Sequence, residues 1–217
     1  MTGGSTPNVV AFDREGVRGY LHRPAAPAPR GVVLAHGASG DCASPILVAT
    51  ARAFSAACFA ALRIDLPYRQ RRPKGPPSPA TAAQDRAGLK AAVLAMRETV
   101  AGDVLMGGHS YGGRQSTMLA AEEPQLAAGL VLLAYPLRPP GKPEQWRFQH
   151  FSQIKIPAIF VHGTRDPFGS IDEMRKAIAA LPSPAQLIVV EGAGHLLGGD
   201  RFDPTALVKA ALAGLQG

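Results

Sequence analysis

Ser110 lies in the segment "GGHSYGG" (107–113), where small residues surround a single hydroxyl group. The frame Gly108-His109-Ser110-Tyr111-Gly112 matches the pattern G-x-S-x-G, in which a serine is held on a sharp turn between a strand and a helix. Glycines allow such a turn and leave room for a substrate. A helix that begins near Tyr111 would offer free backbone N–H groups to a developing negative charge. The segment therefore predicts nucleophilic chemistry at Ser110.

A serine nucleophile needs a base that takes its proton, and the sequence offers six histidines for this role. We favour His195, because it follows the last predicted strand in a glycine-rich loop that can carry its ring over the sheet edge. His36 and His162 precede glycines at strand ends, where a histidine usually holds its own loop. The other three candidates have no comparable position: His22, His109 and His150.

The base in turn needs an acid that orients it. Asp166 lies just beyond a predicted strand, in "VHGTRDPFG", although an Asp-Pro pair is also typical of a turn or a helix cap. Its rival is Asp65, which ends "LRID" beside a basic segment and is better suited to a structural salt bridge. The order Ser110, Asp166, His195 places nucleophile, acid and base at the ends of three different strands.

An oxyanion hole requires two N–H donors. We predict the backbone N–H groups of Tyr111, after the nucleophile, and of Ala38, in the loop "HGASGDC". A phosphate-binding loop is the rival interpretation of these glycines. However, neither G-x-x-x-x-G-K-[ST] nor G-x-G-x-x-G occurs there.

The elements that must position these residues alternate along the chain. Residues 8–12 and 17–24 are predicted to form a hairpin. Six apolar runs then predict strands covered on both faces: "GVVLAHG", "ALRIDLP", "DVLMGG", "GLVLLAYP", "AIFVHG" and "QLIVVEG".

Helical segments lie between these strands. Ser44-Pro45 and Ser170 with Glu173 are typical of helix starts, and Asp203-Pro204 opens a last helix. Leu89, Val93, Met96 and Val100 form one apolar stripe. The sequence thus predicts an α/β fold in one domain, residues 1–217, with a mostly parallel sheet and helices on both faces.

A formal net charge of +7 and a pI of about 9.8 raise the question of anionic partners. The basic residues are scattered, except for a loop that holds Arg69, Arg71, Arg72 and Lys74. Because no nucleic-acid-binding motif accompanies them, we expect a solvated rim and no nucleic-acid partner. A preference of this loop for anionic substrates stays open.

No apolar run reaches the roughly 20 residues that cross a bilayer, and the first sixteen residues lack a signal-peptide pattern. Cys42 and Cys58 do not make a disulfide framework or a metal site by spacing. We expect reduced thiols in a cytoplasmic protein, with no membrane association, Cys58 in the core and the role of Cys42 open.

The stretches "LAHGASG", "LRIDLPY", "GGHSYGGR", "LLAYPL", "VHGTRDPFG" and "EGAGH" resemble the α/β-hydrolase superfamily over nearly the whole chain. They are most similar to its small, dienelactone-hydrolase-like branch. The resemblance implies an eight-stranded sheet with an antiparallel second strand, and a triad of Ser110, Asp166 and His195. Dienelactone hydrolases have a cysteine nucleophile where this sequence has a serine. The resemblance therefore carries over acyl transfer to water but not the lactone substrate.

Relatives often have a lid after the sixth strand, but here residues 137–157 leave room for one short helix only. We therefore expect little or no cap and an open site, with Tyr135, Trp146 and Phe148 as walls of an acyl pocket. Packing of a connecting segment is the alternative for these aromatic residues, most of all for Trp146.

Together these features predict a serine hydrolase of the carboxylesterase or thioesterase type, without metal or cofactor, acting on a small ester or thioester. Two alternatives stay open. An acyltransferase would use the same residues, and some hydrolase-like domains, including members of chromatin complexes, act as interaction modules.

Overall fold

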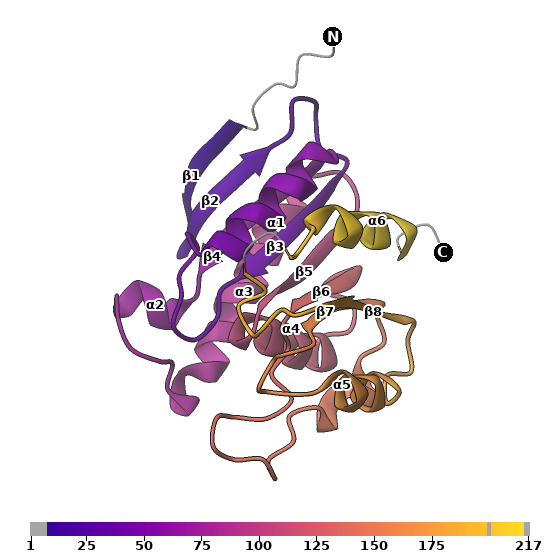
Figure 1. Ribbon diagram of the computed structural model, residues 1–217. Helices are drawn as coiled ribbons and strands as arrows, with labels where there is room; N and C mark the ends of the chain where they lie inside the picture. Colours follow the sequence, from indigo (N-terminus) through magenta and orange to yellow (C-terminus); the bar gives the residue numbers. More distant parts are fainter. Residues whose placement is uncertain (1–7, 199–200, 215–217) are drawn as a thin grey trace.

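The computed structural model describes residues 8–198 and 201–214 and contains one eight-stranded sheet (Figure 1). Residues 1–7, the start of the segment used to predict the absence of a signal peptide, lie outside the described residues. The spatial order of the strands is β1-β2-β4-β3-β5-β6-β7-β8. Their bounds are β1 Asn8–Arg14, β2 Val17–Arg23, β3 Arg30–Ala35, β4 Phe59–Asp65, β5 Val104–His109, β6 Gly129–Leu133, β7 Ala158–Gly163 and β8 Ala185–Val190.

Strand β2 runs antiparallel to both of its neighbours, β1 and β4, whereas every pair from β4 to β8 is parallel. This confirms the antiparallel second strand and the mostly parallel sheet. Because parallel strands share a direction, the carboxyl ends of β3 to β8 lie at one edge of the sheet.

Helices cover both faces of the sheet (Figure 1). Helix α1 (Pro45–Ala56) and helix α6 (Pro204–Gly214) pack on one face, and α3 (Ala82–Arg97), α4 (Tyr111–Glu122) and α5 (Ile171–Ile178) pack on the other. Side chains of β3 alternate between the two layers, with Val32 and Leu34 toward α1 and Val33 and Ala35 toward α3. The central strands therefore need apolar residues at every position.

Shorter elements complete the chain: α2 (Pro67–Arg71) and the 3₁₀-helices η1 (Pro79–Thr81) and η2 (Gln149–Gln153). The single short helix expected within residues 137–157 is η2. Helix α2 lies where the sequence indicated only a basic loop. Among the described residues, no helix is long and apolar enough to cross a bilayer.

The helix starts follow the sequence signals with one difference. Ser170 and Glu173 form the expected capping box, and Asp203 accepts a hydrogen bond from Thr205 N. Ser44 takes the N-cap position of α1, but its hydroxyl donates to Asp41 O and caps no helix N–H. There, proline at the first helical position sets the start of the helix.

Two expectations about burial are wrong. Strand β8 is not covered on both faces: as an edge strand it buries only Val190 completely. Cys58 is exposed and not in the core. The chain turns there from α1 into β4 through a left-handed conformation (φ 64°), so Phe59 enters the core in its place.

Candidate active site

Ser110 occupies a strained turn between β5 and α4. Its backbone has φ 50° and ψ −109°, a region that residues with a side chain rarely adopt. Backbone hydrogen bonds hold the turn: Ser110 N donates to Leu133 O at 2.8 Å, and Gly112 N donates to His36 O at 3.1 Å. Strand β6 and the residue that follows β3 thus fix the position of the serine.

The glycines beside Ser110 are required by the close approach of β3. A Cβ atom on Gly108 would lie 2.0 Å from the carbonyl oxygen of Ala35, and one on Gly112 would lie 2.3 Å from the same atom. Gly108 also has φ 151°. Side chains at these positions would therefore push the turn away from the sheet.

Ser110, His195 and Asp166 form one chain of hydrogen bonds at the carboxyl edge of the sheet. The distance from Ser110 Oγ to His195 Nε2 is 2.8 Å, and the distance from His195 Nδ1 to Asp166 Oδ2 is also 2.8 Å. A proton on Nδ1 donated to the carboxylate leaves Nε2 free to accept the serine proton. The structure thus brings together the three residues that the sequence singled out.

Asp166 is held in place from its own loop. Its side chain is fully buried, and Oδ1 accepts a hydrogen bond from Phe168 N at 2.9 Å. The ring of Phe168 contacts the ring of His195 edge-on, with 4.4 Å between the ring centres. The turn after β7 therefore holds both the Asp166 carboxylate and the ring of His195.

Asp65, the rival acid, lies elsewhere. Its Oδ1 accepts a hydrogen bond from Cys42 N at 2.7 Å and lies 3.9 Å from His36 Nε2. The expected salt bridge to the basic loop is absent among the described residues, because the carboxylate turns toward the loop after β3. Burial is the main cause that raises the pKa of the Cys42 thiol, to about 12, and Asp65 adds to it.

His109 has a contact that the sequence did not reveal. Its Nε2–H donates to the carbonyl oxygen of His195 at 2.9 Å. Burial lowers the pKa of His109 to about 4, so the ring stays neutral near pH 7. His36 and His162 bond locally, to Gly37 O and Gly169 O, as expected of loop-holding histidines.

The loop after β3 is oriented by Tyr68 and Arg69. The hydroxyl of Tyr68 donates to Gly37 O at 3.1 Å, and Arg69 Nε donates to Gly40 O at 2.8 Å. In a trans peptide the N–H points opposite to the C=O, so the N–H of Ala38 points away from Tyr68. A Cβ on Gly37 would lie 3.5 Å from Ser110 Cβ, so this loop lies against Ser110.

Neither the N–H of Ala38 nor that of Tyr111 donates to any residue that the structure describes. Tyr111 is the first residue of α4, where backbone N–H groups have no partner within the helix. The Tyr111 hydroxyl is bonded to the buried Asp85 carboxylate at 2.8 Å. These two N–H groups are available to a ligand beside Ser110.

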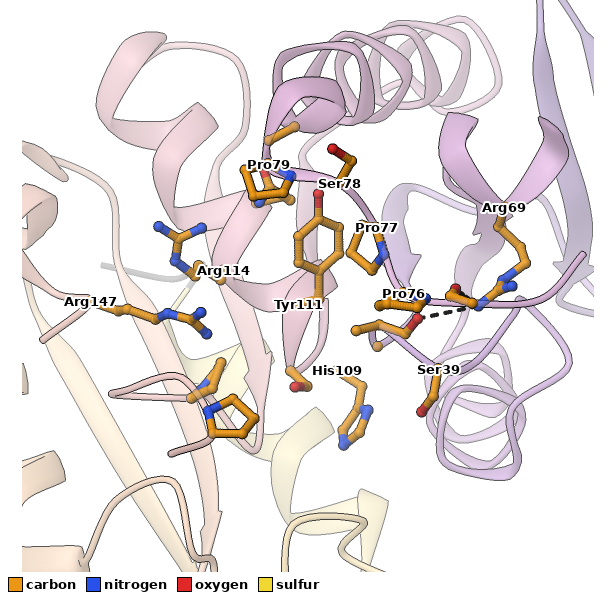
Figure 2. A pocket seen from close by; sticks show the side chains of 18 of the residues that line it. Ser39, Arg69, Pro76, Pro77, Ser78, Pro79, His109, Tyr111, Arg114 and Arg147 are labelled. Atoms are coloured by element: carbon orange, nitrogen blue, oxygen red, sulfur yellow. Dashed lines mark hydrogen bonds between the residues drawn. The ribbon is translucent and has the colours of Figure 1, made fainter. Parts of the chain in front are cut away.

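Ser110 and His195 open into a cavity of about 1030 Å³. Figure 2 shows Tyr111 between the proline-rich loop with Pro76 and Pro77 on one side and Arg114 and Arg147 on the other. The loop 73–79 forms one wall. The cavity has room for an organic substrate of moderate size.

The predicted pocket residues Tyr135, Trp146 and Phe148 are not among the described residues that line this cavity, so that expectation is wrong. Tyr135 is fully buried and donates its hydroxyl to Arg147 O. The Trp146 ring packs under the guanidinium of Arg138, and Phe148 packs on the core. From the same connecting segment, Pro136, Pro140 and Arg147 reach the cavity instead.

The basic loop is only partly a solvated rim. Arg69 is buried and donates to the carbonyl groups of Gly40 and Ala38, whereas Arg71 and Arg72 are exposed. Lys74 is exposed at the edge of the cavity. Arg69 therefore serves to hold the loop that carries Ala38.

Comparison with known proteins agrees with this architecture. A family model described as an alpha/beta hydrolase domain matches residues 28–206. A dienelactone hydrolase from Anabaena variabilis superposes with a TM-score of 0.73 at 21% identity, covering 98% of each chain. Est1E from Butyrivibrio proteoclasticus superposes with a TM-score of 0.76 at 17% identity, covering 96% of this chain and 99% of that one. An alpha-beta serine hydrolase homologue from Coxiella burnetii superposes with a TM-score of 0.72 at 18% identity, covering 96% of this chain and 98% of that one.

Proposed function

Because the chain belongs to the alpha/beta hydrolase family, we propose that it is a serine hydrolase that cleaves a carboxylic ester or thioester. The observation that carries the proposal is the pair of 2.8 Å contacts that joins Ser110 to His195 and His195 to Asp166. This arrangement supplies an activated nucleophile without a metal ion or a cofactor.

In the proposed reaction, Ser110 Oγ attacks the carbonyl carbon while its proton passes to His195 Nε2. The carbonyl oxygen becomes an oxyanion, which accepts hydrogen bonds from the N–H groups of Tyr111 and Ala38. Collapse of this intermediate breaks the bond to the leaving group, which takes the proton from His195. Asp166 holds the imidazole in the required tautomer and stabilises its charged form.

The acyl group is then bound to Ser110. A water molecule gives a proton to His195 and attacks the acyl carbon. The same two N–H groups stabilise the oxyanion that forms. The acid is released as Ser110 recovers its proton. Transfer to an acceptor other than water would use the same acyl-enzyme. The assays therefore also include alcohols and amines as competing acceptors.

A cytoplasmic location also belongs to the proposal. Cys42 and Cys58 are both free thiols, which fits a reducing compartment. The expected partner is the small-molecule substrate itself, since the cavity at Ser110 matches the size of such a ligand.

The proposal is tested by hydrolysis of 4-nitrophenyl and thioester acyl chains of increasing length, with Ser110→Ala as the comparison. We expect turnover by the native protein and a loss of at least 10³-fold in the variant, whose circular dichroism is unchanged. Equal rates in the two proteins would overturn the assignment of Ser110. Absence of turnover with any substrate would favour the interaction module.

A further inference from the structure

The cavity beside Ser110 is lined by basic side chains and by no acidic ones among the described residues. Its described lining holds five basic residues and neither Asp nor Glu; the basic residues are Arg69, Lys74, Arg86, Arg114 and Arg147. Cations that face a cavity without counter-charges attract anions.

Three of these cations have other partners or face the solvent. Arg69 is bonded to loop carbonyl groups. Arg86 pairs with Glu122 at 2.9 Å and donates to Gln115. Lys74 is exposed at the edge. The charges of the remaining two, Arg114 and Arg147, are not accounted for in this way.

Arg114 and Arg147 have no counter-charge among the described residues. Neither guanidinium takes part in any of the ion pairs that the described residues form. Arg114 Nε is completely buried and has no hydrogen-bond partner in the described part of the chain. A buried charged donor without an acceptor is costly, and an anionic ligand at this guanidinium would remove that cost.

The two guanidinium groups are also close to each other. Figure 2 shows them next to one another on one side of Tyr111. Burial lowers the pKa of Arg147, and the charge of Arg114 lowers it further. The surrounding groups do not compensate these charges: His150 has its pKa lowered to about 4 by burial and by Arg114, and burial raises the pKa of Tyr135 to about 12.

The backbone holds this pair in a fixed position relative to Ser110. Arg114 is on the first turn of α4, and its N–H donates to Ser110 O at 2.9 Å. Arg147 N donates to Leu137 O at 2.8 Å, and Arg147 O accepts from the Tyr135 hydroxyl. A ligand between the two guanidinium groups would therefore lie in the same cavity as Ser110.

We propose that Arg114 and Arg147 form a carboxylate subsite, so that the substrate is an ester or thioester that carries a second, ionised carboxyl group. The inference rests on the proposed hydrolase function. Two guanidinium groups present planar, charged donors that match the two oxygens of a carboxylate. The carboxylate belongs either to the acyl part or to the leaving group.

Two pairs of substrates test the subsite and separate these sources. For the acyl part, the 4-nitrophenyl monoester of adipic acid is compared with the ester of 5-carbamoylpentanoic acid, which has the same shape without the charge. For the leaving group, the acetyl ester of 4-hydroxybenzoate is compared with that of 4-hydroxybenzamide. We expect kcat/KM to favour the anion at least tenfold in one of the two pairs, mainly through KM, and the preference to weaken at high salt.

The variants are Arg114→Gln and Arg147→Gln, with Arg71→Gln as the control for net charge, because Arg71 is exposed and does not line the cavity. Each cavity variant should reduce the preference in kcat/KM for the anionic substrate about tenfold. The kcat/KM for the matched amide substrate should stay within threefold of the native value. Because each removes an uncompensated like charge, the apo protein should melt no lower than the native one. Arg71→Gln should keep the preference.

Equal rates within both substrate pairs, or a preference that survives both arginine substitutions, would overturn the subsite while the hydrolase function stands. If no ester is hydrolysed, calorimetry on the Ser110→Ala protein gives an independent answer. Hexanoate binding that hexanamide does not match, and that Arg147→Gln removes, would support the subsite. Equal binding of the two ligands, or no binding of either, would overturn it.

Discussion

His109, the residue directly before Ser110, donates a hydrogen bond from Nε2 to the carbonyl oxygen of His195 at 2.9 Å. The element that carries the proposed nucleophile thus also holds the backbone of the proposed base. The bond joins residues that are 86 positions apart in the chain. A rigid turn at Ser110 therefore fixes the other end of the Ser110–His195 pair as well.

Removal of this bond should slow the reaction without changing substrate affinity. In His109→Phe an aromatic ring is kept but the donor is lost, so we expect kcat to fall about tenfold, the equivalent of one hydrogen bond of about 1.4 kcal/mol. KM should stay within twofold, and His109→Gln should recover part of the rate. Steady-state kinetics on a short-chain ester provide the measurement, and an unchanged kcat in His109→Phe would refute the positioning role.

The two candidate acids should respond differently to the same substitution. Asp166→Asn leaves the loop geometry but favours the wrong tautomer of His195, so kcat should fall by roughly 10⁴. Asp65→Asn retains an oxygen that accepts from Cys42 N and should keep kcat within threefold. If Asp65→Asn instead gave the larger loss, Asp166 would not be the acid.

Gly112 should not tolerate a methyl group. A Cβ there would lie 2.3 Å from Ala35 O, a backbone atom that cannot move aside without shifting β3. We expect Gly112→Ala to lower the free energy of unfolding by about 2 kcal/mol or more and to reduce activity. Gly198→Ala is the control, because nothing lies within 4 Å of the added atom. Urea denaturation of both variants measures the difference, and equal stabilities would contradict the packing argument.

Stability should depend on pH through His22, which is buried on β2. Burial and the neighbouring Arg63 lower its pKa from 6.5 to about 4. Between these pH values the unfolded chain binds a proton that the folded chain does not, so the free energy of unfolding falls as the pH drops. His22→Gln keeps an acceptor for Arg63 Nε and should reduce this fall, measured between pH 7 and 4.5, by about 2 kcal/mol. The same fall in both proteins would show that His22 is not responsible.

The sequence predicted most of the sheet and the place of Ser110, Asp166 and His195, because each lies shortly after an apolar run that forms a strand of the parallel part of the sheet. Parallel strands bring such loops to one edge regardless of the details of packing. The capping box at Ser170 was predictable for a similar reason, since it depends only on residues of one helical turn.

The cavity walls were not predictable, because residue type does not reveal whether a side chain faces the core or the solvent. Tyr135 and Phe148 are aromatic residues of the kind expected in an acyl pocket. However, Tyr135 lies in the core and donates its hydroxyl to Arg147 O, and Phe148 packs against the core. Arg114 and Arg147 are far apart in the chain, and their proximity depends on how that segment folds over α4. Strand β8 was misjudged because an apolar run does not reveal its place at the sheet edge.

The central claim, an activated serine at position 110, is tested most directly by the intact mass of the folded protein after exposure to a fluorophosphonate. The native protein should gain one adduct, and Ser110→Ala should gain none. An adduct on both proteins would place the reactive group elsewhere. Absence of an adduct on folded native protein would contradict the claim that His195 and Asp166 activate Ser110.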